Sequence, residues 1–224
     1  MMLINLSISQ STSHSGPVSP KIVQFSYSYD ITSCIAISGL ASHPFGSWMQ
    51  RGSETNFMWL RDKLPADVSA FRQIIYGYDT SLTGDESFQA IDDLASSFVA
   101  KLRSIGRSAT ATKPLIFFAH SLGGIVLKHA LVTLAGSCGV EKAILEKTRS
   151  IFFFGVPHLG MEMSHLLVIA KGQPNEPLIR ALSHENGYLT LLDTQFHGIV
   201  TLYKIQVISA YETKLSRAAQ VSNA

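Results

Sequence analysis

The stretch F-F-A-H-S-L-G-G-I-V, residues 117–126, contains the transition that decides the fold. It begins in an apolar, strand-like run, passes through a serine and continues into an apolar, helix-like run. Ala119 lies two residues before Ser121, and Gly123 lies two residues after it. Both positions must be small in a sharp strand-to-helix turn, because the strand and the helix approach each other closely there. The stretch therefore predicts a strand, a tight turn at Ser121 and a buried helix.

Short apolar runs and helical patterns alternate along the rest of the chain, as they do in parallel α/β sheets. Uninterrupted apolar runs are typical of strands that are covered on both faces. Residues 87–105 carry an apolar stripe at spacings of three and four, and Leu122 to Ala135 is apolar on nearly all sides, so both segments are predicted helices. The predicted strands are 21–28, an edge strand, then 33–38, 73–78, 114–119, 150–156 and 202–209. The expected fold is α/β, a mostly parallel sheet with helices on both faces.

Length and composition favour one globular domain. The chain has 224 residues, of which 46% are hydrophobic and 15% are charged, which is enough apolar material for a substantial core. Residues 1–20 are rich in serine and contain two prolines, so we expect a flexible arm before a domain at 21–224. The connection at 157–201 is too long for one crossover helix. It is interpreted either as a cap over the site or as extra packing helices.

Several classes of protein are disfavoured by the same numbers. The formal net charge is only +2 and no Lys/Arg cluster stands out, so we expect no nucleic-acid partner. The two cysteines lack metal-site spacing and no Gly-rich phosphate loop is present, so we expect neither a metal nor a cofactor. The N-terminus lacks the features of a targeting signal, and no apolar run is long enough to cross a bilayer. The prediction is an intracellular, cytoplasmic protein without a transmembrane segment.

The residues around Ser121 predict nucleophilic chemistry. The pattern A-x-S-x-G differs from the nucleophile elbow G-x-S-x-G only by Ala119, the smallest side chain available. The N–H of Leu122 begins the next helix and is a candidate oxyanion donor, since helix N-termini favour developing negative charge. A second donor is expected in the loop after an early strand, where Gly39 permits a tight turn and Leu40 supplies the N–H. The alternative for that loop is an ordinary glycine turn.

Six blocks follow one another along the chain. They are I-S-G-L-A-S-H-P-F-G-S-W (37–48), F-M-W-L-R-D-K-L-P (57–65), I-Y-G-Y-D-T (75–80), A-H-S-L-G-G-I-V-L-K-H-A-L (119–131), F-F-F-G-V-P-H-L-G-M (152–161) and I-S-A-Y-E-T-K (208–214). Taken in order, these blocks resemble the fungal lipase-like serine hydrolases of the α/β-hydrolase fold, which are related to the serine-active-site lipase-like proteins and the GPI inositol-deacylase-like hydrolases. The resemblance implies acyl transfer to an elbow serine from a small-molecule ester, lipid or thioester. Many members have His-Gly-Leu-Gly-Gly where this chain has Ser38 to Ser42, a change that backbone donors tolerate.

The sequence offers a candidate for the acid of the triad at the expected position but no histidine at the position expected for the base. α/β-Hydrolases order their triad as Ser, then Asp or Glu, then His, with the acid after the strand that follows the long connection. Glu212 occupies that position, although a solvated surface glutamate is the alternative. All eight histidines precede Glu212, and family members usually continue through another strand to a His-bearing loop. His158 follows the strand 150–156 at the correct edge of the sheet and is the candidate substitute base, ahead of His120, His197 and His43 on geometric grounds.

Two functions therefore stay open. The first is a serine hydrolase that uses Ser121 as nucleophile, Leu122 and Leu40 as oxyanion donors and Glu212 as acid. Its base is expected either beyond the last residue of this sequence or as a substitute such as His158. The second is a truncated or inactive hydrolase-like domain that binds ligands or partners, with self-association through an unpaired sheet edge at 202–209. A misassigned gene ending is a third explanation for the missing histidine. Met161 and Met163 are candidates to line an acyl pocket, although apolar residues at helical spacing are more often plain core.

Overall fold

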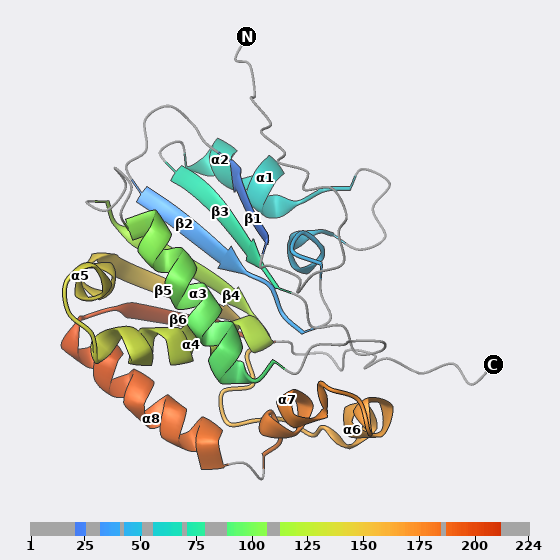
Figure 1. The fold of residues 1–224 in the computed structure, drawn as a ribbon. Coiled ribbons are helices and arrows are strands. Elements are labelled where there is room, and N and C mark those ends of the chain that lie inside the picture. Colours follow the sequence, from blue (N-terminus) through green and yellow to red (C-terminus); the bar gives the residue numbers. More distant parts are fainter. Residues whose placement is uncertain are drawn as a thin grey trace.

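Six strands form one sheet in the order β1-β3-β2-β4-β5-β6 (Figure 1). Strand β1 is antiparallel to β3, and the other neighbouring strands are parallel. The strands are β1 (Lys21–Phe25), β2 (Thr32–Ile37), β3 (Phe71–Gly77), β4 (Leu115–His120), β5 (Thr148–Phe154) and β6 (Gln206–Ala210). The structure is a computed structural model that describes residues 21–25, 32–40, 43–50, 56–68, 71–78, 89–106, 113–184 and 187–211. The predicted mostly parallel α/β fold is confirmed, whereas the predicted arm at 1–20 lies outside the described residues.

Helices lie on both faces of the sheet, as predicted. The larger layer contains α3, α4, α5 and α8, whose buried side chains share one core with the sheet. The smaller layer, on the opposite face, contains the 3-10 helix η1 and two one-turn helices. The helices are η1 (Gly46–Trp48), α1 (Trp59–Asp62), α2 (Leu64–Asp67), α3 (Ile91–Gly106), α4 (Leu122–Ala135), α5 (Val140–Lys147), α6 (Ser164–Ala170), α7 (Glu176–Ala181) and α8 (Gly187–Leu202).

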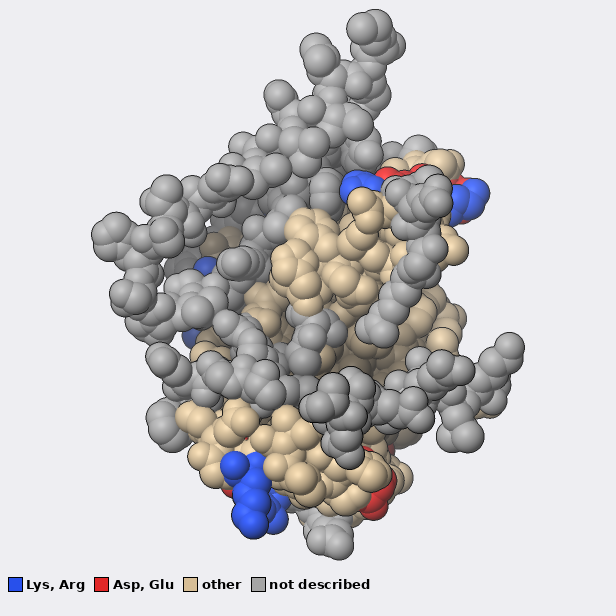
Figure 2. All heavy atoms as spheres, turned by 90° about the vertical axis from the view of Figure 1, so that its right-hand side faces the viewer, with Lys and Arg blue, Asp and Glu red and all other residues tan. Residues whose placement is uncertain are grey.

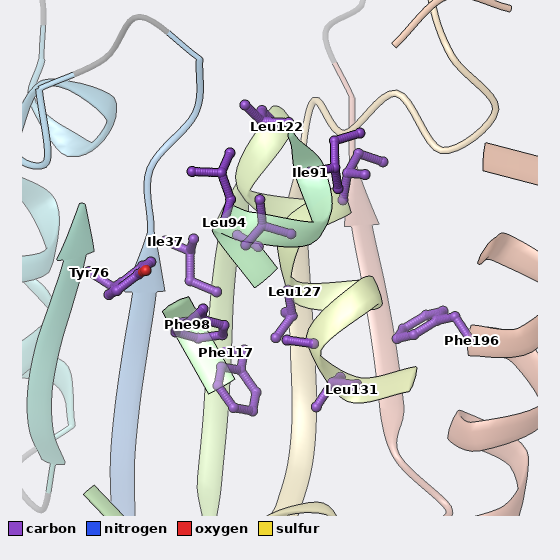
Figure 3. Packing of buried hydrophobic residues seen from close by; sticks show 14 of the residues in the cluster. Ile37, Tyr76, Ile91, Leu94, Phe98, Phe117, Leu122, Leu127, Leu131 and Phe196 are labelled. Atoms are coloured by element: carbon purple, nitrogen blue, oxygen red, sulfur yellow. The ribbon is translucent and has the colours of Figure 1, made fainter. Parts of the chain in front are cut away.

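The alternation of side chains along β2 explains why the strand reads as an uninterrupted apolar run. Ile35 and Ile37 point into the larger core beneath α3 and α4. Cys34 and Ala36 point into the smaller core beside Trp48. Figure 3 shows side chains of α3 and α4 packed over the face of β2 and β4 that lines the larger core. Both faces of the central strands are covered, as the composition predicted.

The predicted strand at 202–209 is wrong in its first part. Residue Leu202 ends α8, and β6 begins only at Gln206. The helical period decides the boundary, because Leu192, Phe196 and Ile199 recur at spacings of four and three and bury one face of α8. Lys204, with φ of 53°, then reverses the chain into the strand. An apolar run that spans this junction resembles a single strand although it contains two elements.

The connection at 157–201 forms α6, α7 and α8. Helix α8 packs along α4, and α6 packs against α7. Figure 1 shows α6 and α7 together on the side toward which the parallel strands run. Buried side chains of all three helices belong to the larger core, so the connection is continuous with the domain. A cap function for this region stays a prediction.

Candidate active site

Ser121 occupies the turn between β4 and α4. Its backbone has φ of 51° and ψ of −126°, and it is one of three non-glycine residues with positive φ among the described ones. A side chain makes this region of φ costly, by about 1 to 3 kcal/mol, so surrounding structure must hold the residue there. The N–H of Ser121 donates to the carbonyl oxygen of Phe154 at 3.0 Å, which ties the turn to the end of β5. The serine is partly exposed and its side chain caps no helix.

Close packing around the turn explains the small residues that flank it. A Cβ atom on Gly123 would lie 2.4 Å from the carbonyl oxygen of Ser38 and 2.8 Å from that of Ile37. A Cβ atom on Gly124 would lie 2.3 Å from a methyl group of Val156. All three distances are far below van der Waals contact. The first turn of α4 thus lies directly against the end of β2 and the segment that follows β5.

The loop after β2 lies against Ser121. A Cβ atom on Gly39 would lie 2.8 Å from Cβ of Ser121 and 2.9 Å from Nδ1 of His120. The N–H of Gly39 donates to Oγ of Ser47 at 3.4 Å. Leu40, the next residue, is partly buried and packs against the larger core. The sequence predicted an oxyanion loop here, and the structure places that loop beside the serine.

The N–H of Leu122 is the first of helix α4. In the part of the chain that the structure describes, no acceptor faces this N–H. An unused N–H at a helix N-terminus beside a serine is the arrangement that stabilises an oxyanion. Leu122 and Leu40 thus lie on the two segments that meet at Ser121. Their use as donors stays a prediction.

His158 lies between β5 and α6, with its ring toward the α4–α8 layer. The ring stacks edge-on against Phe153 at 4.9 Å between centroids. Burial, together with the positive charge of Lys128, lowers the pKa of His158 to about 4, partly offset by Asp193. Its Nδ1 is buried without a hydrogen-bond partner among the described residues. The imidazole is therefore neutral at pH 7, which permits it to accept a proton but disfavours its charged form.

The remaining predicted site residues lie in different environments. Glu212, the candidate acid, lies outside the described residues. The ring of His120 lies edge-on to that of Trp48 with the centroids 6.4 Å apart, and His197 lies on α8. Met163 is buried in the larger core with 2% of its surface exposed, whereas Met161 is 43% exposed. The two methionines do not share one surface, and their role in binding stays a prediction.

One buried contact at the site was missed from the sequence. The hydroxyl of Tyr78 donates to the carbonyl oxygen of Ser38 at 2.9 Å, and both residues are buried. The contact joins residues 40 positions apart, so neither spacing nor periodicity indicates it. The only local signal is a tyrosine directly after a glycine at the end of a buried strand.

The sequence matches a family described as "Putative serine esterase (DUF676)" over residues 46–202, which is most of the chain. The chain belongs to this family. Ser121 and the predicted oxyanion donor Leu122 lie within the matched segment, whereas Leu40 and Glu212 lie outside it. The serine-esterase part of the predicted resemblance is confirmed.

Curated relatives align with most of this chain. Protein SERAC1 of Homo sapiens is 25% identical over 193 residues, which cover 79% of this chain and 29% of that protein. The Danio rerio protein is 24% identical over 195 residues. This chain therefore spans about three tenths of the length of these relatives. They are animal proteins and do not support the fungal grouping.

Two solved structures share the fold. Mature lipase BlEst2 of Bacillus licheniformis has a TM-score of 0.54 at 15% identity, covering 90% of this chain and 75% of that chain. Phospholipase PlaB of Legionella pneumophila in complex with thio-NAD has a TM-score of 0.59 at 16% identity, covering 83% of this chain and 38% of that chain. At such identities the similarity establishes the fold.

No helix in the described segments is both long and apolar enough to cross a lipid bilayer. Among the described side chains, no group of three or more His, Cys, Asp or Glu residues is arranged to hold a metal ion.

Proposed function

We propose that the chain is a serine hydrolase that uses Ser121 as its nucleophile on carboxylic esters, lipids or thioesters. The observation that carries this proposal is the backbone of Ser121, held at φ of 51° in a tight turn between β4 and α4. A strained serine at the carboxyl end of a parallel strand, followed by a buried helix, is the geometry of a nucleophile elbow. Strain of this kind persists where neighbouring structure enforces it, and it concentrates at functional sites.

The chemistry follows from the groups around the turn. Oγ of Ser121 attacks the carbonyl carbon of the ester and gives its proton to a base, which forms a tetrahedral oxyanion. The N–H groups of Leu122 and Leu40 would donate to that oxygen. Collapse expels the alcohol, which takes up the proton, and water then attacks the acyl-enzyme and releases the acid. Glu212 is the proposed acid and His158 the proposed substitute base.

The substrate class rests on family membership and on the surface near the site. Figure 2 shows the face toward which the parallel strands run. Where described residues are visible on it, most charged side chains lie near its two ends, and uncharged types lie between them. The two solved structures of the same fold are named as a lipase and a phospholipase. A small-molecule ester or lipid with an apolar acyl chain suits such a surface.

A binding domain without catalysis is the second candidate. It is favoured by the surroundings of His158 in the described structure, where the ring contacts Phe153 and its pKa responds to the charges of Lys128 and Asp193, while no hydrogen bond joins it to Ser121. A hydrolase needs a base within hydrogen-bond reach of its serine when substrate is bound. In this alternative the same surface binds a ligand or partner without turning it over.

Covalent labelling by a fluorophosphonate probe separates the two candidates. We expect the wild type to be labelled and Ser121→Ala to be unlabelled, while Ser104→Ala, at an exposed position of α3, is labelled like the wild type. The His158→Ala variant tests the base, since labelling should fall by about 10²- to 10⁴-fold if His158 activates the serine. No labelling of the wild type above the Ser121→Ala background contradicts the hydrolase proposal.

A further inference from the structure

The loop that faces Ser121 is held by a buried tyrosine. Residue Tyr78 directly follows β3 and is 6% exposed. Its hydroxyl donates to the carbonyl oxygen of Ser38 at 2.9 Å. Desolvation raises the pKa of Tyr78 well above its usual value, so the phenol keeps its proton throughout the working pH range. The hydroxyl is therefore protonated and able to donate at neutral pH.

This hydrogen bond fixes the orientation of a whole peptide group. The carbonyl of Ser38 and the N–H of Gly39 belong to one planar unit and point in opposite directions. At one end Tyr78 donates to the carbonyl, and at the other end the N–H donates to Oγ of Ser47 at 3.4 Å. The N–H of Ser38 is also occupied, since it donates to the carbonyl oxygen of Tyr76 at 3.3 Å. The peptide is clamped on both sides.

The clamped peptide determines how the loop meets the serine. Gly39 is so close to Ser121 that a Cβ atom on it would lie 2.8 Å from Cβ of the serine. The Ser38 carbonyl oxygen lies just above Gly123 at the start of α4, in a fully buried position. A rotation of the 38–39 peptide would move Gly39 and the following N–H of Leu40 relative to Oγ of Ser121.

A second contact joins the end of β3, which precedes Tyr78, to the segment that contains Ser47. A Cβ atom on Gly77 would lie 2.1 Å from Cγ of Pro44, so Pro44 packs directly on the backbone that precedes Tyr78. Pro44 and Ser47 belong to the same short loop, 43–48. The two groups that clamp the 38–39 peptide are thus themselves held together, and the end of β3 acts as the support of the oxyanion loop.

We propose that Tyr78 is a positioning residue, whose hydroxyl aligns the Ser38–Gly39 peptide and thereby the oxyanion donor of Leu40 with Ser121. This inference rests on the proposed hydrolase function. Loss of the hydroxyl leaves a buried carbonyl without its donor, and the peptide then turns to find another partner. Misplacement of a catalytic group by about 1 Å costs on the order of 10²-fold in rate, and loss of one oxyanion donor costs about 10²- to 10³-fold.

Replacement of one hydroxyl, with a neighbouring hydroxyl as control, tests the inference. Tyr78→Phe removes the donor and keeps the ring. Tyr76→Phe makes the same chemical change two residues earlier, where the buried hydroxyl has no partner among the described residues. For both variants we would measure the rate of fluorophosphonate labelling, kcat and KM on p-nitrophenyl butyrate, and amide hydrogen exchange of the peptide that contains residues 38–40.

We expect Tyr78→Phe to lower the labelling rate and kcat by about 10- to 100-fold with KM within about twofold of wild type. Its amide exchange should accelerate at 38–40 and stay unchanged in β2 and α4. Tyr76→Phe should match the wild type in rate and in exchange at 38–40. Wild-type labelling rate in Tyr78→Phe overturns the inference, and so does equal acceleration of exchange throughout β2 and α4, which would indicate general destabilisation.

The two proposals fail in distinguishable ways. If the wild type is not labelled, the hydrolase proposal fails, and the exchange experiment alone decides whether Tyr78 holds the loop. In that case, faster exchange confined to 38–40 in Tyr78→Phe supports the positioning role, and unchanged exchange overturns it. If the wild type is labelled through Ser121 and Tyr78→Phe is labelled equally fast, the hydrolase proposal stands and the positioning role is wrong.

Discussion

Gly39 is the residue where a single methyl group would disturb the site most directly. Alanine at this position would bring Cβ to 2.8 Å from Cβ of Ser121 and to 2.9 Å from Nδ1 of His120. The loop and the elbow would have to separate, because neither neighbour is the end of a long flexible side chain. We expect Gly39→Ala to slow fluorophosphonate labelling by about 10²-fold or more, since catalytic geometry is lost at about 1 Å of displacement.

Gly46→Ala is the matched control for this prediction. A Cβ atom on Gly46 would meet only Cβ of His43, at 3.7 Å, which is ordinary van der Waals contact. The control should be labelled at the wild-type rate, and both variants should melt within a few degrees of the wild type. Labelling of Gly39→Ala at the wild-type rate would show that the loop does not constrain the serine.

His158 makes the stability of the fold depend on pH. An unfolded histidine takes up a proton as the pH falls below about 6.5, whereas folded His158 stays neutral until its pKa of about 4. Unfolding therefore binds a proton in this window, and the free energy of unfolding decreases as the pH falls from about 6.5 to 4. For a half-buried ring the loss is about 1 to 3 kcal/mol.

His158→Gln should remove this share of the pH dependence, because glutamine does not titrate. The measurement is urea denaturation of wild type and variant at pH 7.5, 6, 5 and 4, with the difference between the two curves as the readout. A difference that stays constant over this range would contradict the assigned pKa.

At the scale of elements, a partly buried ion pair joins α4 to α8. Lys128 is 1% exposed and its ammonium group donates to Oδ1 of Asp193, whose side chain is 31% exposed. The ammonium group also lies 5.2 Å from the ring centroid of Phe196. Removal of Asp193 leaves the buried ammonium group of Lys128 without its counter-charge in an apolar layer. Asp193→Ala should therefore lower the free energy of unfolding by about 3 kcal/mol.

Lys128→Met should cost less than Asp193→Ala, because it removes the buried charge and leaves a carboxylate that reaches water. We expect about 1 kcal/mol or less for the methionine variant, since apolar replacements of buried ion pairs are often neutral. Urea denaturation followed by far-UV circular dichroism measures both variants. If Lys128→Met is the more destabilising of the two, the ion pair contributes net stability, contrary to this prediction.

Sequence patterns predicted the elements whose signals are local. Helix α4 was predicted with its observed bounds, Leu122–Ala135, because an all-round apolar run follows a turn of small residues. The turn at Ser121 was predicted from the small residues that flank it, and the loop at Gly39 from the tight turn that a glycine permits after a strand. The first part of the strand at 202–209 was misplaced, because apolar and polar residues continue to alternate, as in a strand, across the junction between α8 and β6.

Contacts between distant positions were beyond sequence reasoning. Tyr78 and Ser38 are 40 residues apart, and Lys128 and Asp193 are 65 residues apart. Each of these pairs depends on how strands and helices are placed against one another, which no periodicity specifies. The partner of Lys128 follows only from the packing of α8 on α4.

At the scale of the whole molecule, the sheet has an exposed apolar edge. Strand β6 pairs with β5 on one side, and the described strands provide no neighbour on its other side. All five of its residues are exposed, including Val207 and Ile208 at 37% and 40%. Exposed edges with apolar side chains invite pairing with another strand. We therefore predict weak self-association of this chain through β6.

Charge placed on the edge should abolish that association. A Val207→Lys/Ile208→Lys double variant puts two like charges on an edge that would have to face its own copy, and strand pairing of that kind is disfavoured by them. Sedimentation velocity between about 1 and 100 μM should show a concentration-dependent shift for the wild type and none for the double variant. Val168→Lys, on α6 at 76% exposure, is the control for added charge elsewhere and should associate like the wild type. If the control and the double variant lose association equally, net charge rather than the β6 edge governs it, and a wild type that stays monomeric throughout contradicts the prediction outright.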